Sequence, residues 1–157
     1  MKLAHFFRHL ALSLFMLASV SLAFAQERGT ADEAKAMAEN GLAHIKAVGP
    51  DKAFADFSEK EGKWHNKDLY IFAVKFDGTV VAQGANKALI GKNLMDLKDP
   101  DGKFFIKEMI ELGKAKGTGW VDYSYTDPQT KKFAPKSSYV ARVPGYEGIL
   151  GVGIYKK

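Results

Sequence analysis

The amino-acid sequence predicts an α+β domain in which helices cover an antiparallel sheet. Three observations lead to this prediction. Apolar residues recur at helical spacing near the N-terminus, over residues 34–48 and 53–57. An apolar run, residues 69–76, is followed by Asp-Gly, a strong short-range signal of a β-hairpin. Farther along, residues 117–143 are rich in aromatic and β-branched residues on both sides of an Asp-Pro turn, which indicates a second, longer hairpin.

The chain begins with a segment typical of an export signal. Lys2 and Arg8 precede a long apolar run, and Ala23-Phe24-Ala25 places small residues where a signal peptidase cleaves. The run is too short and wrongly flanked for a membrane span. We therefore expect a cleaved signal peptide over residues 1–25 and one folded domain over residues 26–157. The product should be periplasmic and should not span the membrane.

Composition argues against several classes of function. The formal charge of +5 falls to +3 without Lys2 and Arg8, and the lysines are interspersed with acids, so we expect no nucleic acid partner. Cysteine is absent, which removes thiolate ligands, a cysteine nucleophile and disulfides. Beyond the leader only His44 and His65 remain, and they are not at metal-ligand spacing. We expect no metal and no cofactor.

The first two helices carry their own start and stop signals. Thr30 and Glu33 fit a capping box, which predicts a helix beginning there. Gly49-Pro50 ends that helix and starts the next one, with proline at the first helical position. We expect Gly62 to stop the second helix.

The middle of the chain predicts a hairpin, a long loop and a helix. Asp77-Gly78 joins the strand at residues 69–76 to a return strand at 79–83, in a turn where both central residues are expected to have positive φ. Residues 84–99 show no clear period, and a connection of that length is more often functional than filler. Asp99-Pro100-Asp101-Gly102 is expected to open a third helix, which ends at Gly117.

The C-terminal part concentrates aromatic rings and lysines. Rings with polar tips beside a cation make a good wall for a small anionic ligand, but the same pattern fits an ordinary half-buried sheet with a solvated lysine edge. Gly151 and Gly153 fall on one face of the last strand, which often marks close approach of a helix or ligand. The residues concerned on the hairpin are Trp120, Tyr123, Tyr125, Tyr139, Lys131, Lys132 and Lys136.

The order of two helices, a strand pair, a long loop, a helix and three antiparallel strands is a PAS-like α+β arrangement. The residues from 69 onward resemble the single Cache domain family, in the subtype found alone in periplasmic proteins and as the sensing part of chemoreceptors and histidine kinases. The resemblance covers essentially all of residues 26–157. It rests on YIFAVKFDGTVVAQGANKALIGKNLMDLKDPDGKFFIKEMI, GWVDY, PKSSYV and GVGIY.

This resemblance implies a central five-stranded antiparallel sheet with a long N-terminal helix on one face. On the other face, a loop and a short helix would form a lid over a pocket for small metabolites, often short-chain carboxylates. The loop would be residues 84–94. The resemblance places Tyr70 and Phe72 on the pocket floor and makes wall residues of Trp120, Tyr123, Lys136 and Tyr139.

Three functions are consistent with the sequence. The first is a sensor-type domain that binds a small organic acid without catalysis, with Lys136 pairing the carboxylate and Phe72 and Trp120 holding the apolar end. The second is an interaction module that docks onto a membrane-bound sensor protein. The third and weakest is a hydrolase that uses His65. Thermal shift with metabolites separates the first two.

Overall fold

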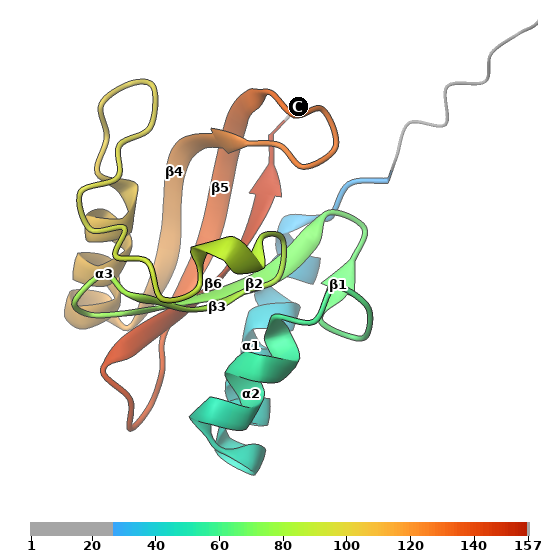
Figure 1. Cartoon of the computed structure of the whole chain (residues 1–157), viewed down its shortest axis with the longest axis vertical. Coiled ribbons are helices and arrows are strands. Elements are labelled where there is room, and N and C mark those ends of the chain that lie inside the picture. The colour runs from blue at the N-terminus through green and yellow to red at the C-terminus, as the bar shows by residue number, and fades with distance from the viewer. Residues whose placement is uncertain (1–26, 157) are drawn as a thin grey trace, which may run out of the picture.

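Two helices open the part of the chain that the computed structural model describes, residues 27–156 (Figure 1). Helix α1 (Ala31–Val48) begins with the predicted capping box, in which Thr30 and Glu33 bond reciprocally. Helix α2 (Pro50–Phe57) begins at the predicted proline. It ends before the predicted Gly62, because the Ser58 hydroxyl bonds to the Phe54 carbonyl and closes the last turn. The predicted signal peptide lies outside the described residues, and the domain bounds at 26 and 157 remain predictions.

The strands are β1 (His65–Asn66), β2 (Leu69–Lys75), β3 (Val80–Gln83), β4 (Thr118–Thr126), β5 (Phe133–Arg142) and β6 (Gly148–Tyr155). Five of them form an antiparallel sheet in the order β3-β2-β6-β5-β4, which confirms the predicted architecture. The short strand β1 pairs with the start of β2 and adds a sixth. Figure 1 shows how strongly the sheet twists between β2 and β4.

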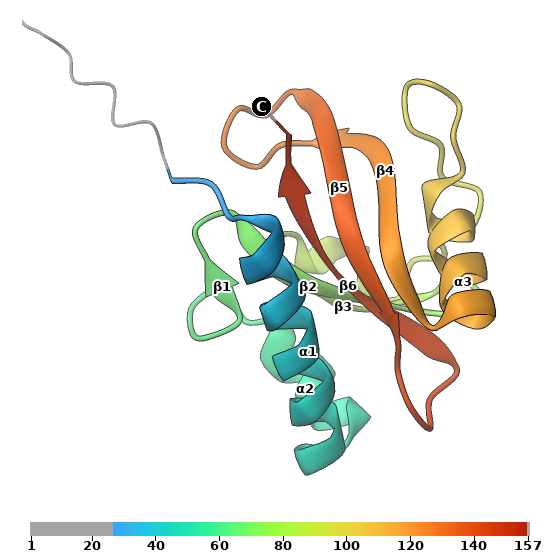
Figure 2. The ribbon, with the colours of Figure 1, turned by 180° about the vertical axis from the view of Figure 1, so that it is seen from behind.

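The two faces of the sheet carry separate hydrophobic cores. Ile71 and Ala73 of β2 pack under α1 and α2. Figure 2 shows these two helices in front of the sheet. Phe72 and Val74 point the other way, into a core formed with helix α3 (Phe105–Lys116). This alternation follows from the period-two geometry of a strand, and it explains why β2 is apolar at nearly every position.

The first hairpin is confirmed, although its turn differs from the predicted one. Gly78 has a positive φ of 91°, whereas Asp77 does not have a positive φ. The Asp77 carboxylate accepts a bond from the Thr79 amide, which stabilises the turn in place of a second positive φ. The long connection after β3 contains a short 3-10 helix, η1 (Lys87–Leu89), and returns to pair Asn93 with Thr79.

The segment Asp99-Pro100-Asp101-Gly102 does not open the third helix, contrary to the prediction. Helix α3 begins at Phe105, and the four residues form a turn closed by the Asp99 side chain. One Asp99 oxygen accepts bonds from the amides of Asp101 and Lys103, and the other accepts from Ser124 on β4. The carboxylate therefore ties the loop to the sheet. Both of its oxygens are used there, so they are not available to cap a helix N-terminus.

Candidate ligand-binding site

Three side chains form a row across strands β4, β5 and β6. In the strand register Tyr123 lies opposite Lys136, and Lys136 lies opposite Tyr155. Residues directly opposite one another point to the same face of a sheet. Tyr70 from β2 completes the group, because its hydroxyl accepts a hydrogen bond of 2.6 Å from the Lys136 ammonium nitrogen.

Lys136 is a buried cation surrounded by aromatic rings. Its side chain is among the largest that are fully buried, with a relative exposure of 1%. The Nζ atom lies 4.3 Å from the ring centroid of Tyr70, 4.7 Å from that of Tyr155 and 5.3 Å from that of Tyr125. Within residues 27–156, its only hydrogen-bond partner is the Tyr70 hydroxyl and no carboxylate lies within 4.0 Å. The amine is held by dipoles and rings without a paired anion.

Burial governs the protonation of this group. Removal from water lowers the pKa of Lys136 to about 7, and the charges of Asp68 and Asp127 offset only part of that effect. Burial also raises the pKa of Tyr70 and of Tyr123 well above the usual phenol value. These phenols therefore stay protonated at neutral pH and remain able to donate hydrogen bonds.

Glycine on β6 makes room for the lysine. A β-carbon at Gly153 would collide with Cε of Lys136 and with the Ser138 hydroxyl, and one at Gly151 would collide with the ring of Phe72. The groups that approach these two glycines are side chains of β2 and β5, in place of the helix or ligand that the sequence suggested. Ser138 is itself fixed by a 2.9 Å hydrogen bond to the Tyr123 hydroxyl.

A small inner cavity adjoins the tyrosines on the α3 side of the sheet. Its volume of about 20 Å³ is close to the space that one water molecule needs. Phe105 from α3 stacks on Tyr123 with ring centroids 4.5 Å apart, which closes one wall. Apart from the phenols and one amide, the lining is apolar: Tyr70, Phe72, Val74, Val80, Gln83, Leu94, Phe105, Ile106, Met109, Tyr123 and Tyr125.

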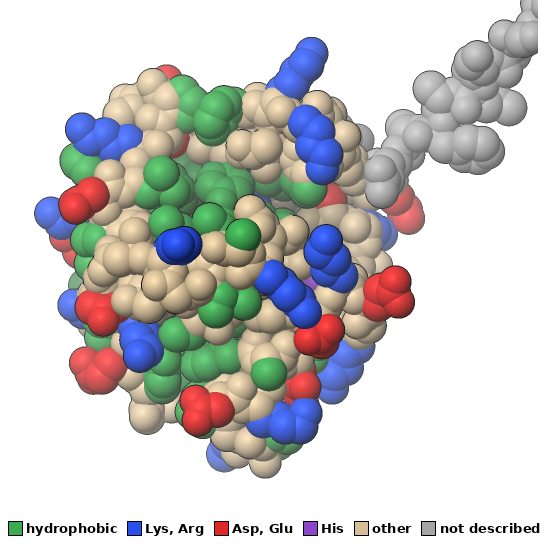
Figure 3. All heavy atoms as spheres, in the orientation of Figure 1, with side chains coloured by type: hydrophobic (Ala, Val, Ile, Leu, Met, Phe, Trp, Pro, Cys, Tyr) green, Lys and Arg blue, Asp and Glu red, His purple; other side chains and the backbone are tan. Residues whose placement is uncertain are grey.

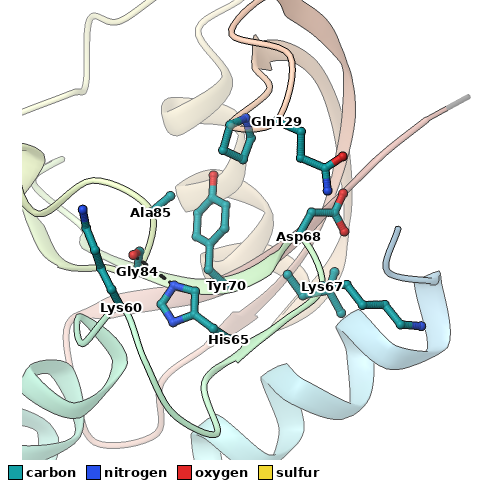
Figure 4. Close-up of a pocket in the computed structure, with 10 residues that line it drawn as sticks. Lys60, His65, Lys67, Asp68, Tyr70, Gly84, Ala85 and Gln129 are labelled. Carbon is teal, nitrogen blue, oxygen red and sulfur yellow. Dashed lines mark hydrogen bonds between the residues drawn. The ribbon is translucent and has the colours of Figure 1, made fainter. Parts of the chain in front are cut away.

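Two larger hollows lie outside this cavity and share Tyr70 with it. One, of about 400 Å³, runs from Gln83 and Tyr125 past Leu89 to Lys131. The other, of about 420 Å³, lies between the β1–β2 turn and the β4–β5 turn and is drawn in Figure 4. Figure 3 shows hydrophobic side chains gathered on this side of the molecule around the connection after β3. Tyr70 therefore lines the inner cavity and both outer hollows.

His65 lines the second outer hollow, where its Nε2 atom lies 3.0 Å from the Gly84 carbonyl oxygen (Figure 4). When Nε2 carries the proton, it donates a hydrogen bond to the Gly84 carbonyl, and this bond fixes the orientation of the ring. The Nδ1 atom has no hydrogen-bond partner among the described residues. The ring is therefore not part of a serine–histidine–acid arrangement within residues 27–156.

Four of the six predicted site residues come together, and two do not. Tyr70, Phe72, Tyr123 and Lys136 all lie on the α3 side of the sheet, around or next to the inner cavity. Trp120 and Tyr139 pack against each other with ring centroids 5.5 Å apart. Tyr139 belongs to the core under α1, so this pair lies on the opposite face. The two residues lie directly opposite each other on β4 and β5. Neighbouring positions along a strand point to opposite faces, so the residues next to them point to the site face.

The six residues that the resemblance placed at the pocket leave out three that the fold brings to the site, Tyr155, Tyr125 and Gln83, although Tyr125 was among the hairpin rings noted in the sequence. Tyr155 could have been found from its spacing, because it lies two residues after Gly153 and so on the same strand face. Tyr125 stands in the same relation to Tyr123. Gln83 could have been found as the one amide side chain in an apolar strand. Its side-chain oxygen accepts a hydrogen bond from the Ala85 amide. Of the hairpin lysines, Lys131 and Lys132 are exposed.

Comparison with known proteins identifies the family of this chain. The sequence model described as single Cache domain 2 matches residues 8–157. The chain belongs to the single Cache domain 2 family. Domains of this family are extracytoplasmic sensor modules that bind ligands, and they occur in chemotaxis receptors and histidine kinases. Within residues 27–156, no helix combines the length and the hydropathy that a membrane crossing requires.

Relatives of this Cache domain include two longer signalling proteins. The sensor histidine kinase MctS of Rhizobium johnstonii is 34% identical over 91 residues, which are 58% of this chain and 20% of the kinase. The methyl-accepting chemotaxis protein CtpM of Pseudomonas aeruginosa is 31% identical over 93 residues, which are 57% of this chain and 16% of the receptor. The shared segment is thus at most about a fifth of each relative.

Solved structures show the same Cache fold. A methyl-accepting chemotaxis protein from Vibrio parahaemolyticus aligns with a TM-score of 0.66 and 27% identity, over 79% of this chain and 86% of that one. A Cache chemosensory domain that recognises carboxylic acids aligns with a TM-score of 0.68 and 23% identity, over 80% of this chain and 92% of that one. At this identity the second likeness concerns the fold alone.

Proposed function

We propose that this domain is a periplasmic sensor module that binds a short-chain monocarboxylate without catalysing a reaction. The observation that carries the proposal is the buried ammonium of Lys136, which within residues 27–156 has a phenol but no carboxylate as its hydrogen-bond partner. A buried charge is costly unless it is paired, and a ligand carboxylate supplies the missing charge. The fold neighbour that recognises carboxylic acids supports this class of ligand.

The surrounding groups suit a carboxylate in particular. Tyr70 and Tyr123 stay protonated, so they present hydroxyl groups and no competing negative charge. In this arrangement Lys136 makes a charge-assisted hydrogen bond to one ligand oxygen, and the Tyr70 hydroxyl orients the carboxylate. A charge-assisted bond of this kind is typically worth about 1.5–3 kcal/mol.

The apolar lining limits the rest of the ligand. Phe72, Ile106 and Met109 offer only hydrocarbon and thioether surface beside the tyrosines. A second carboxylate or an ammonium group on the ligand would lie there without a partner, which costs several kcal/mol. The proposed ligand is therefore an aliphatic acid with a short tail and a single charge.

Binding requires the cavity to open. The inner cavity of about 20 Å³ is too small even for acetate, whereas the first outer hollow, of about 400 Å³, is large enough. Leu94 lines the first and Leu89 the second, and both belong to the connection that follows β3. We propose that this connection acts as the lid, and that the acid passes Tyr70 and Gln83 on its way in.

Docking onto a membrane-bound sensor is the alternative function. It is favoured by the relatives, in which the segment shared with this chain is a small part of a signalling protein. A domain of this size that senses a ligand needs an output partner or an output region to report it. The two functions differ in ligand dependence, because a docking module without a ligand gains no stability from a metabolite.

A thermal-shift series with matched compounds tests the proposal. Acetate, propionate and butyrate are compared at pH 6.5 with propionamide, which has the same shape without the charge, and with succinate, which has two charges. A ligand present at 100 times its Kd stabilises the folded protein by about 2.7 kcal/mol. We expect stabilisation by at least one monocarboxylate and by neither control. Equal shifts with propionamide would remove the role of the charge, and no shift with any acid would favour the docking module.

A further inference from the structure

Two buried carboxylates lie at the end of the sheet close to Lys136. Asp68 comes from the turn between β1 and β2, and Asp127 comes from the turn between β4 and β5. Their side chains are 1% and 2% exposed. Both raise the pKa of Lys136, so their charges reach its ammonium group. Either acid is a natural counter-ion for the lysine, yet neither lies within 4.0 Å of it.

Arg28 takes up both acids. Its Nη1 atom lies 3.0 Å from an oxygen of Asp68 and 3.0 Å from an oxygen of Asp127, and its Nη2 atom lies 2.6 Å from the other Asp127 oxygen. A planar guanidinium suits such a bidentate contact, which an ammonium group cannot reproduce. The contact holds the pKa of Asp127 far below its ordinary value.

The remaining acceptor positions of the acids are also used. Asp68 accepts a bond of 2.7 Å from the Gly29 amide. Asp127 accepts bonds from the Gln129 amide and the Thr130 hydroxyl. Hydrogen bonds from Arg28, from the neighbouring Gly29 amide and within the β4–β5 turn thus satisfy both carboxylates without Lys136.

The two cations meet on one aromatic ring. The guanidinium carbon of Arg28 lies 5.4 Å from the ring centroid of Tyr155, and Lys136 Nζ lies 4.7 Å from the same centroid. Tyr155 is fixed by a 2.8 Å hydrogen bond to the Thr126 carbonyl. Removing the charge of Arg28 would leave two buried acids and one nearby cation. A lysine side chain is flexible and would be drawn toward them, because like other charges it is costly to bury unpaired.

We propose that Arg28 is a positioning residue that neutralises Asp68 and Asp127 and thereby reserves the Lys136 ammonium for a ligand carboxylate. This inference rests on the proposed function of the site. It also ties the ligand to the segment that leads into α1, because Arg28 precedes that helix by three residues. The charged and titratable groups around Lys136 are Arg28, Asp68, Asp127, Tyr70, Tyr123, Tyr125 and Tyr155.

The test separates the charge of Arg28 from its role as a structural tie. Arg28→Gln removes the charge, and Arg28→Lys keeps it without the planar fork. Lys67→Gln is the matched control, because Lys67 ties the same N-terminal segment through Glu33 at 2.7 Å without touching either buried acid. For each variant, propionate affinity is measured by calorimetry at pH 6.5. Titration of the Lys136 side chain is followed by nuclear magnetic resonance in the ligand-free protein.

We expect Arg28→Gln to weaken propionate binding at least tenfold and to raise the titration midpoint of Lys136 by at least one pH unit. Arg28→Lys and Lys67→Gln should stay within threefold in affinity and within half a unit in midpoint. A purely structural tie would lower the stability of both Arg28 variants without moving the midpoint, and that result would overturn the inference.

Two further outcomes are covered by the same series. If Arg28→Gln does not fold, the triple variant Arg28→Gln, Asp68→Asn, Asp127→Asn leaves no acid that competes for Lys136 and should bind propionate like the wild type, and tenfold weaker binding there would contradict the proposal. If wild-type protein binds no monocarboxylate, the proposed function fails by itself. The Lys136 midpoints of the ligand-free proteins then decide the inference about Arg28.

Discussion

Lys136 occupies space that Gly153 leaves free on the neighbouring strand. A β-carbon at position 153 would stand 3.2 Å from the lysine Nζ atom and closer still to Cε. Strand β6 therefore requires glycine at the position beside the buried amine of strand β5. The absence of one side chain on β6 places the cation against the rings of Tyr70 and Tyr155.

Gly153→Ala should destabilise the protein by about 1–3 kcal/mol, because an added methyl group overfills a packed site. In a Lys136→Ala background the same substitution should cost at least 0.5 kcal/mol less, since the lysine Cε is no longer present. Urea unfolding of the four proteins gives the coupling energy directly. Additive effects within error would mean that Gly153 does not shape the lysine site.

Stability of the ligand-free protein should increase between about pH 7 and pH 9. The pKa of Lys136 is about 7 in the folded state and about 10.4 in an unfolded chain. Between these values the unfolded state binds more protons, so raising the pH favours the folded state, by up to ~1.4 kcal/mol per pH unit. Lys136→Met should flatten this slope, and Lys132→Met, at an exposed position, should keep it. Unfolding in urea at pH 7, 8 and 9 makes the comparison. Equal slopes in the two variants would contradict the account.

The turn after β2 offers a test of the fold. Gly78 has a positive φ, and a β-carbon there would stand 2.8 Å from both the Asn93 carboxamide oxygen and Met95. Gly78→Val should therefore lower the free energy of unfolding by about 1–2 kcal/mol or more, whereas Lys92→Ala at an exposed position nearby should change it by less than about 0.5 kcal/mol. Matching denaturation midpoints would show that the turn tolerates a branched side chain.

The sequence was informative where a local pattern has one structural solution. The capping box at Thr30, the proline at the start of α2 and the glycine of the Asp-Gly turn each satisfy a backbone requirement within a few residues. The resemblance made Lys136 a residue of the pocket wall, and the structure buries its side chain. The resemblance to Cache domains supplied the five-stranded antiparallel sheet with a long N-terminal helix on one face.

Other features depended on contacts that the local sequence does not encode. Trp120 and Tyr139 are aromatic like the site tyrosines, but the strand pleat places them on the α1 face. Asp99 was predicted to be a helix-start residue, because the local sequence does not show that the Ser124 amide of β4 bonds to its carboxylate. Arg28 acts across the whole chain, since its partners lie 40 and 99 residues away. Such placements follow from strand register and from turns meeting in space.

Export should leave Gln26 as the first residue. The prediction rests on Ala23-Phe24-Ala25 after an apolar run, and it places the new N-terminus two residues before Arg28. Intact mass of the protein recovered from the periplasm measures the cleavage site. A mass that still includes residues 1–25 would show that the leader is retained.

The central claim is that Lys136 pairs the carboxylate of a small acid, and calorimetric titration of two lysine variants tests it most directly. Lys136→Met keeps an unbranched apolar side chain and should preserve the fold. It should weaken binding of the best acid from the thermal-shift series by about ten- to hundredfold, or roughly 1.5–3 kcal/mol. Lys132→Met should bind within about threefold of the wild type, because an exposed charge contributes little. If both variants bind the acid equally, the carboxylate site lies elsewhere.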